Sequence, residues 1–85
     1  MKITVKLYAH LGNFLPPGAK DNQVELVFED GTTVASAFAG LNVPAEQCHL
    51  VLVNGMFVPP GARDEHELKD QDALAAWPPV AGGGA

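Results

Sequence analysis

The order of hydrophobic patterns along the chain limits the possible folds more than any other feature. The one helical pattern is short and lies between two groups of strand patterns. Residues 2–9 and 23–29 alternate apolar and polar side chains, the period of two that indicates half-buried strands. The helical face consists of Val34, Ala37, Phe38 and Leu41. A helix over residues 34–39 is too short to be stable alone, so it must lie on a sheet.

Three further strands follow the helix. Residues 49–53 are nearly all apolar, which is typical of a central strand. Asn54-Gly55 predicts a tight hairpin turn into a short strand at residues 56–58. Residues 73–78 predict a fifth strand, which we place parallel to the first in the middle of a mixed sheet. The chain is therefore expected to be an α+β roll with the order ββαββ and one helix on one face of the sheet.

The connections carry turn and cap signals. Glycine, proline and asparagine interrupt residues 10–22, which predicts a loop. Thr32 and Thr33 are candidate N-caps. Residues 61–72 are polar, with Leu68 as their expected anchor in the core. At 85 residues the chain is one domain, which we place at residues 1–79, followed by a flexible glycine-rich tail at residues 80–85.

Charge and composition exclude several classes of function. The formal net charge is -5, which argues against nucleic acid or an anionic membrane as the main partner. No apolar run reaches the ~18 residues of a membrane helix, and the alternating N-terminus does not resemble a signal peptide. A single cysteine provides no disulfide framework. We therefore expect a soluble protein of the cytoplasm.

The side chains that could take part in catalysis or metal binding show no pattern of an active site in the sequence. The three histidines, His10, His49 and His66, lack metal-ligand spacing. Cys48 is interpreted as a buried thiol, and the acidic residues of 64–72 as a solvated loop that does not match a calcium site. We expect no metal, no bound cofactor and no catalysis by this chain alone.

The end of the chain is unusual. Pro78 and Pro79 follow the last strand and cannot continue a sheet ladder. Val80, Ala81 and residues 82–84, three glycines, come next. A glycine-rich terminus alone is most often frayed. After two prolines and a compact roll, however, this segment suits insertion into a narrow channel, because glycine has no side chain.

Five stretches resemble the MoaD/ThiS family of ubiquitin-like β-grasp sulfur carriers, in particular the small subunit of molybdopterin synthase. They are Lys2 to Tyr8 in the first strand, Asp30-Gly31-Thr32-Thr33-Val34 before the helix, Leu50 to Gly55 at the hairpin, Leu68 to Asp72 before the last strand, and Trp77-Pro-Pro-Val-Ala-Gly-Gly83. The last stretch is the most specific, and the double proline favours the MoaD type. The resemblance implies the β-grasp fold.

The resemblance also implies a mechanism. An activating enzyme would use ATP to adenylate a C-terminal glycine carboxylate, at Gly83 or Gly84, and sulfur transfer would form a thiocarboxylate. Pro79, Val80, Ala81 and Gly82 would insert into an acceptor, which is the molybdopterin synthase large subunit or another sulfur acceptor. Lys6, Tyr8 and Trp77 would bind the partner from the outer face of the sheet. Tyr8 and Trp77 form either an exposed aromatic patch or a pair partly buried under residues 10–22.

The chain departs from the family at two places. Ala85 follows Gly84, whereas these carriers end at a double glycine, so a peptidase would have to remove Ala85. If Ala85 stays, the chain is instead a non-covalent β-grasp subunit or adaptor. A ThiS-like carrier or a protein-conjugating modifier is a further alternative. Gln71 replaces the usual glycine before the last strand, where we expect only a local change.

Overall fold

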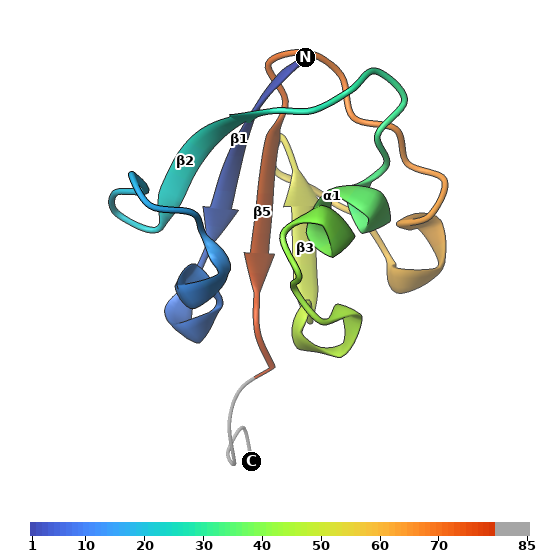
Figure 1. The fold of residues 1–85 in the computed structure, drawn as a ribbon. Helices are drawn as coiled ribbons and strands as arrows, with labels where there is room; N and C mark the ends of the chain where they lie inside the picture. The colour runs from blue at the N-terminus through green and yellow to red at the C-terminus, as the bar shows by residue number, and fades with distance from the viewer. Residues whose placement is uncertain (80–85) are drawn as a thin grey trace.

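The computed structural model describes residues 1–79, which form a five-stranded sheet with one α-helix (Figure 1). The strands are β1 (Lys2–Leu7), β2 (Gln23–Val27), β3 (Leu50–Val53), β4 (Met56–Phe57) and β5 (Ala73–Trp77). The helix is α1 (Val34–Gly40), and the connections contain the 3-10 helices η1 (Ala9–Phe14), η2 (Ala45–Gln47) and η3 (Pro60–Ala62).

The sheet has the strand order β2-β1-β5-β3-β4. β1 and β5 run parallel in its centre, and every other neighbouring pair is antiparallel. The last strand therefore inserts between the first two strands and the hairpin, as Figure 1 shows. This arrangement confirms the predicted mixed sheet with parallel central strands, and the fold is a β-grasp.

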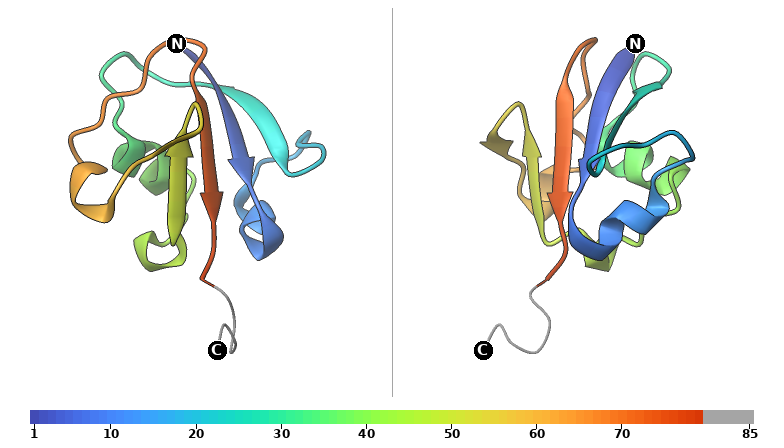
Figure 2. Two further views of the ribbon diagram at one scale, coloured as in Figure 1. Left: turned by 180° about the vertical axis from the view of Figure 1, so that it is seen from behind. Right: turned by 90° about the vertical axis from the view of Figure 1, so that its left-hand side faces the viewer.

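The core lies between the sheet and α1, which covers one face of the sheet (Figure 2). The alternation of strand side chains supplies this core, since every second residue points to the same face. The strand residues buried there are Ile3, Val5, Leu7, Val51, Val53, Leu74 and Ala76. From the helix, Val34, Ala37 and Phe38 pack against them. The opposite face of the sheet, called the outer face below, is not covered by α1.

A capping box starts α1. The Thr33 hydroxyl accepts a hydrogen bond from the Ser36 N–H at 3.1 Å, and the Ser36 hydroxyl accepts one from the Thr33 N–H at 2.8 Å. Of the two threonines considered as caps, Thr33 is the cap, whereas Thr32 donates from its hydroxyl to the Glu29 carbonyl. The helix ends at Gly40. Asn42, two residues later, has a φ of +63°.

Side-chain hydrogen bonds tie the start of β5 to its neighbours. Asp70 accepts from the Lys2 N–H at 2.7 Å, and this hydrogen bond lowers the pKa of the exposed carboxyl from its ordinary value. Asp72 accepts from the side chain of Asn54 at 2.8 Å, and Asn54 in turn accepts from the Ala73 N–H. The hairpin turn and the turn before β5 therefore support each other, and the central strand enters the sheet in a fixed register.

The element boundaries differ from the sequence prediction mostly at their ends. Strands β1, β2 and β5 end one or two residues earlier than predicted. Part of the segment predicted as loop, residues 10–22, is the 3-10 helix η1, which places Leu11 in the core. A helix this short lacks the repeated apolar spacing that would reveal it in a sequence. The anchor predicted at Leu68 is buried as expected.

Candidate functional site

The ends of β1 and β5 bring the predicted partner-binding residues together on the outer face. Lys6 lies beside Ala75 in the parallel register, and the next residue positions on that face are Tyr8 and Trp77. The two aromatic rings stack with their centroids 4.4 Å apart and an interplanar angle of 9°. Lys6, Tyr8 and Trp77 are all half-buried. The aromatic pair is therefore neither fully exposed nor enclosed, since each ring covers one face of the other.

Backbone hydrogen bonds hold β5 from both sides up to its last residue. The Tyr8 N–H donates to the Ala76 carbonyl at 3.0 Å, and the His49 N–H donates to the Trp77 carbonyl at 2.9 Å. Pro78 and Pro79 then have no N–H to donate, so the ladder cannot continue through them. The stacked pair thus stands at the point where the chain leaves the sheet.

Among the residues predicted to carry chemistry, only Pro79 belongs to the described part of the chain, and it is exposed. Val80, Ala81, Gly82, Gly83 and Gly84 lie outside the described residues. Their predicted roles in tail insertion and activation stay predictions. What the structure does provide is the site from which this segment starts.

Three apolar residues on the outer face were missed by the sequence interpretation. Leu52 lies between Ala75 of β5 and Phe57 of β4 in the sheet register, and Leu50 lies opposite Trp77. The exposed fraction is 57% for Phe57 and 36% for Leu50, so both are available for contact. Below, "apolar patch" means Tyr8, Leu50, Leu52, Phe57 and Trp77 together.

A signal for these residues is present in the sequence. Residues 50–53 are apolar on both faces, which was interpreted as typical of a central strand. The sequence predicts only one α-helix, however, and this helix can cover only one face of the sheet. The second apolar set of this strand therefore lies on an uncovered face, where Leu50 and Leu52 are found.

Charged side chains border the apolar patch along β1. On the outer face, Lys6 of β1 lies beside Gln23 of β2, the edge strand. Lys2 is on the same face, at the start of β1. The chain as a whole carries a formal net charge of -5, whereas β1 and β2 present two lysines, Lys2 and Lys6, and one glutamate, Glu25 opposite Thr4, on this face. This combination of apolar centre and charged edge is typical of protein interfaces.

Other chemical groups do not assemble into a second reactive site within residues 1–79. In this part of the chain no three histidine, cysteine, aspartate or glutamate side chains are grouped so that they could hold a metal. The His10 imidazole is bonded to the Gln47 side chain at 3.0 Å. Burial raises the pKa of the Cys48 thiol, although the Arg63 charge acts in the opposite direction. Within residues 1–79 the longest helix is α1, with 7 residues. No helix in this part of the chain is long and apolar enough to cross a membrane.

Comparison with known proteins yields one family match. The model of the family described as "ThiS family" matches residues 5–83, nearly the whole chain. Among curated protein sequences, none matches the chain significantly.

Several solved structures share the fold over almost their whole length. SAMP1 from Haloferax volcanii is 26% identical, with a TM-score of 0.65 over 98% of this chain and 100% of that one. The small archaeal modifier protein 1 from Methanosarcina acetivorans is 25% identical, with a TM-score of 0.63 over 96% of both chains. The complex of subunits 1 and 2 of molybdopterin-converting factor from Helicobacter pylori 26695 contains a chain 19% identical, with a TM-score of 0.58 over 98% of this chain and 100% of that one.

Proposed function

The chain belongs to the ThiS family, and from that membership we propose that it is a MoaD-type sulfur carrier of molybdopterin biosynthesis. At the level of the family, it is a sulfur carrier of the ThiS/MoaD type or a modifier of the SAMP type, and small carriers of this family are non-catalytic. The observation that carries the proposal is the extent of the family match, which continues past β5 through Gly83.

The proposed chemistry takes place on a glycine carboxylate at the end of the tail. An activating enzyme binds ATP, the carboxylate attacks the α-phosphorus, and pyrophosphate leaves. Hydrosulfide then attacks the acyl carbon, AMP leaves, the S–H proton is released to solvent, and the tail ends in a thiocarboxylate. Gly83 or Gly84 carries this group after a peptidase removes Ala85. Residues 79–82 reach into the acceptor, while residues 1–79 form the domain that docks.

The outer face supports this proposal as the surface that both partners contact. The apolar patch includes Trp77, the last residue of β5, so a partner that binds this patch would also lie close to the start of the tail. Each partner would contact the apolar patch, with Lys6 at its edge, while the tail enters the partner's active site. The Helicobacter pylori complex of subunits 1 and 2 supports a large synthase subunit as the acceptor. The protein is proposed to act in the cytoplasm.

A second candidate function rests on a separate observation. The SAMP1 proteins share 25% and 26% identity with this chain, more than the molybdopterin-converting chain at 19%. This difference favours attachment of the activated glycine to lysines of other proteins. Both candidates require the same adenylation, and they differ in whether sulfur or an amine receives the acyl group. A ThiS-type carrier with another sulfur acceptor shares the first two steps.

The deciding experiment is the intact mass of the protein isolated from its native cells. A form ending in glycine, with one oxygen replaced by sulfur, is the result expected for a carrier. Higher-mass adducts that disappear with the glycines would instead support the modifier. A single form that retains Ala85 would contradict both and favour a non-covalent β-grasp subunit.

A further inference from the structure

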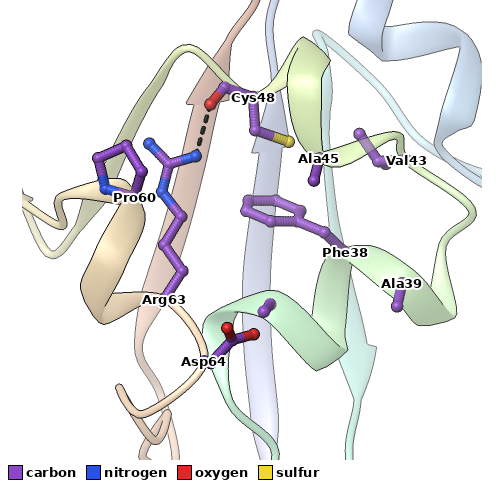
Figure 3. Close-up of a pocket in the computed structure, with 9 residues that line it drawn as sticks. Phe38, Ala39, Val43, Ala45, Cys48, Pro60, Arg63 and Asp64 are labelled. Carbon is purple, nitrogen blue, oxygen red and sulfur yellow. Dashed lines mark hydrogen bonds between the residues drawn. The ribbon is translucent and has the colours of Figure 1, made fainter.

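A cavity of about 320 Å³ lies on the helix side of the molecule, away from the outer face (Figure 3). Its walls come from α1, η2 and η3. The lining is mainly apolar, with Phe38 and Val43 as its larger side chains, and Cys48 and Pro60 beside them. Its size is at the lower end of the range for small-molecule sites, about 300–1,000 Å³. Neither the proposed tail chemistry nor the apolar patch uses it.

One charged side chain is buried in the wall of this cavity. Arg63 has an exposed fraction of 8% and is the only charged residue classed as buried within residues 1–79. Its guanidinium donates to the carbonyls of Cys48 at 2.6 Å, Val58 at 3.3 Å and His49 at 3.3 Å. A guanidinium has five N–H groups. Three of them donate to these carbonyls, and two remain for another acceptor.

No carboxylate of the described residues lies within 4.0 Å of the Arg63 guanidinium. Asp64 also lines the cavity, but Figure 3 shows it at the backbone end of the Arg63 side chain. Burial raises the pKa of the Cys48 thiol, so the thiol is neutral near pH 7 and supplies no counter-charge. Carbonyl oxygens are the only hydrogen-bond partners of the guanidinium within residues 1–79.

A buried cation without an anion is costly, and an anionic ligand would offset that cost. We propose that this cavity binds a small apolar monocarboxylate, with the carboxylate on Arg63 and the hydrocarbon body against Phe38 and Val43. Two remaining N–H groups match the two oxygens of one carboxylate. The cavity and the apolar patch lie on opposite sides of the sheet, so ligand and protein partner can bind together. This inference does not depend on the tail chemistry.

The test is an NMR titration of the ¹⁵N-labelled chain with phenylacetate, using phenylacetamide as the neutral probe of the same shape. Saturable shifts are expected at the amides around the cavity, those of Ala39 and Cys48 among them. For a ligand of this size we expect a dissociation constant of about 1 mM and binding at least tenfold weaker for the amide. Absence of saturation, or equal binding of acid and amide, would overturn the proposal.

Two variants distinguish the cavity from a general surface effect. Replacing Arg63 also removes three hydrogen bonds to carbonyls, so neighbouring residues are changed instead. Ala39→Met fills the mouth from an exposed position and should weaken phenylacetate binding at least fivefold. Asp64→Asn removes a negative charge from the lining and should strengthen it two- to fivefold. Ala19→Met, outside the cavity, is the matched control, and equal effects of both methionine variants would contradict the assignment.

Discussion

At the scale of single residues, Gln71 holds a backbone conformation that usually belongs to glycine. Its φ is +74°, in the left-handed region where a side chain crowds the backbone. Its N–H nevertheless donates to the Lys2 carbonyl at 2.7 Å, which closes the turn before β5. The turn therefore forms with glutamine at this position, although the conformation is one that favours glycine.

Replacing this residue by glycine should make the protein more stable. Gln71→Gly removes the strain of the left-handed conformation, at about 1–2 kcal/mol, and loses about 0.5–1 kcal/mol through the freer unfolded chain. The net expectation is a gain of about 0.5–1 kcal/mol in the free energy of unfolding, measured with urea. Gln71→Ala keeps the Cβ and should gain nothing, so a similar gain in both variants would show that strain is not the cause.

Phe57 provides a residue-scale test of the docking face. Its side chain is 57% exposed at the edge of the apolar patch, so truncation should cost little stability. We expect Phe57→Ala to weaken binding to the activating enzyme about tenfold, the effect of losing a moderate interface contact. Calorimetry with the purified activating enzyme measures it. Val27→Ala is the control, since Val27 is 81% exposed at a distant part of the same face. Equal losses in the two variants would argue against a localised patch.

At the scale of elements, α1 depends on its ends and on the sheet more than on its own length. It has 7 residues, too few for an isolated helix. The capping box of Thr33 and Ser36 satisfies two backbone N–H groups that the first turn leaves free. The cap also fixes the start of the helix directly after the turn that follows β2.

Loss of this cap should be visible in the stability of the whole domain. Thr33→Ala removes the acceptor for the Ser36 N–H and should lower the free energy of unfolding by about 1 kcal/mol. Thr32→Ala changes the same residue type at the neighbouring position, which makes no cap hydrogen bond, and should cost less. Urea unfolding of both variants compares them. A larger loss for Thr32→Ala would show that the capping box does not stabilise the helix.

At the scale of the whole molecule, residues 1–79 form the folded domain, and activation is proposed to take place on the tail that follows it. The core described above is built entirely from residues within 1–79, and its central strand β5 is paired on both sides. The proposed bond changes take place on a glycine carboxylate beyond this domain, while the domain supplies the proposed docking surface. The two properties should therefore respond to different changes.

A chain that ends at Pro79 should fold normally and fail to be activated. Its free energy of unfolding should stay within about 0.5 kcal/mol of the full chain, because no core contact described here is removed. Exchange of pyrophosphate into ATP by the activating enzyme should be lost. The control is the chain ending at Gly84, which should be active in the same assay. Substantial exchange with the truncated chain would contradict activation at the tail glycines.

Local patterns in the sequence determined which segments form strands and the helix, and which strand residues enter the core. Alternation placed Leu74 and Ala76 inward, and the stripe of α1 placed Phe38 on the sheet. Hydrophobic periodicity carries this information because burial repeats with the geometry of each element. The order of the elements also led to the placement of the last strand parallel to the first, and the resemblance to a family of carriers added the predicted role of the tail.

Tertiary structure decided what depends on the relation between distant segments. Tyr8 and Trp77 stack because the parallel register aligns the ends of two strands that are far apart in the sequence. Leu52 and Phe57 extend this patch because the only α-helix described leaves one face of the sheet uncovered. Arg63 becomes a buried charge only when the residue after η3 packs against Cys48 and His49, directly before β3. Periodicity within a segment carries no information about such pairings, which arise when the chain folds.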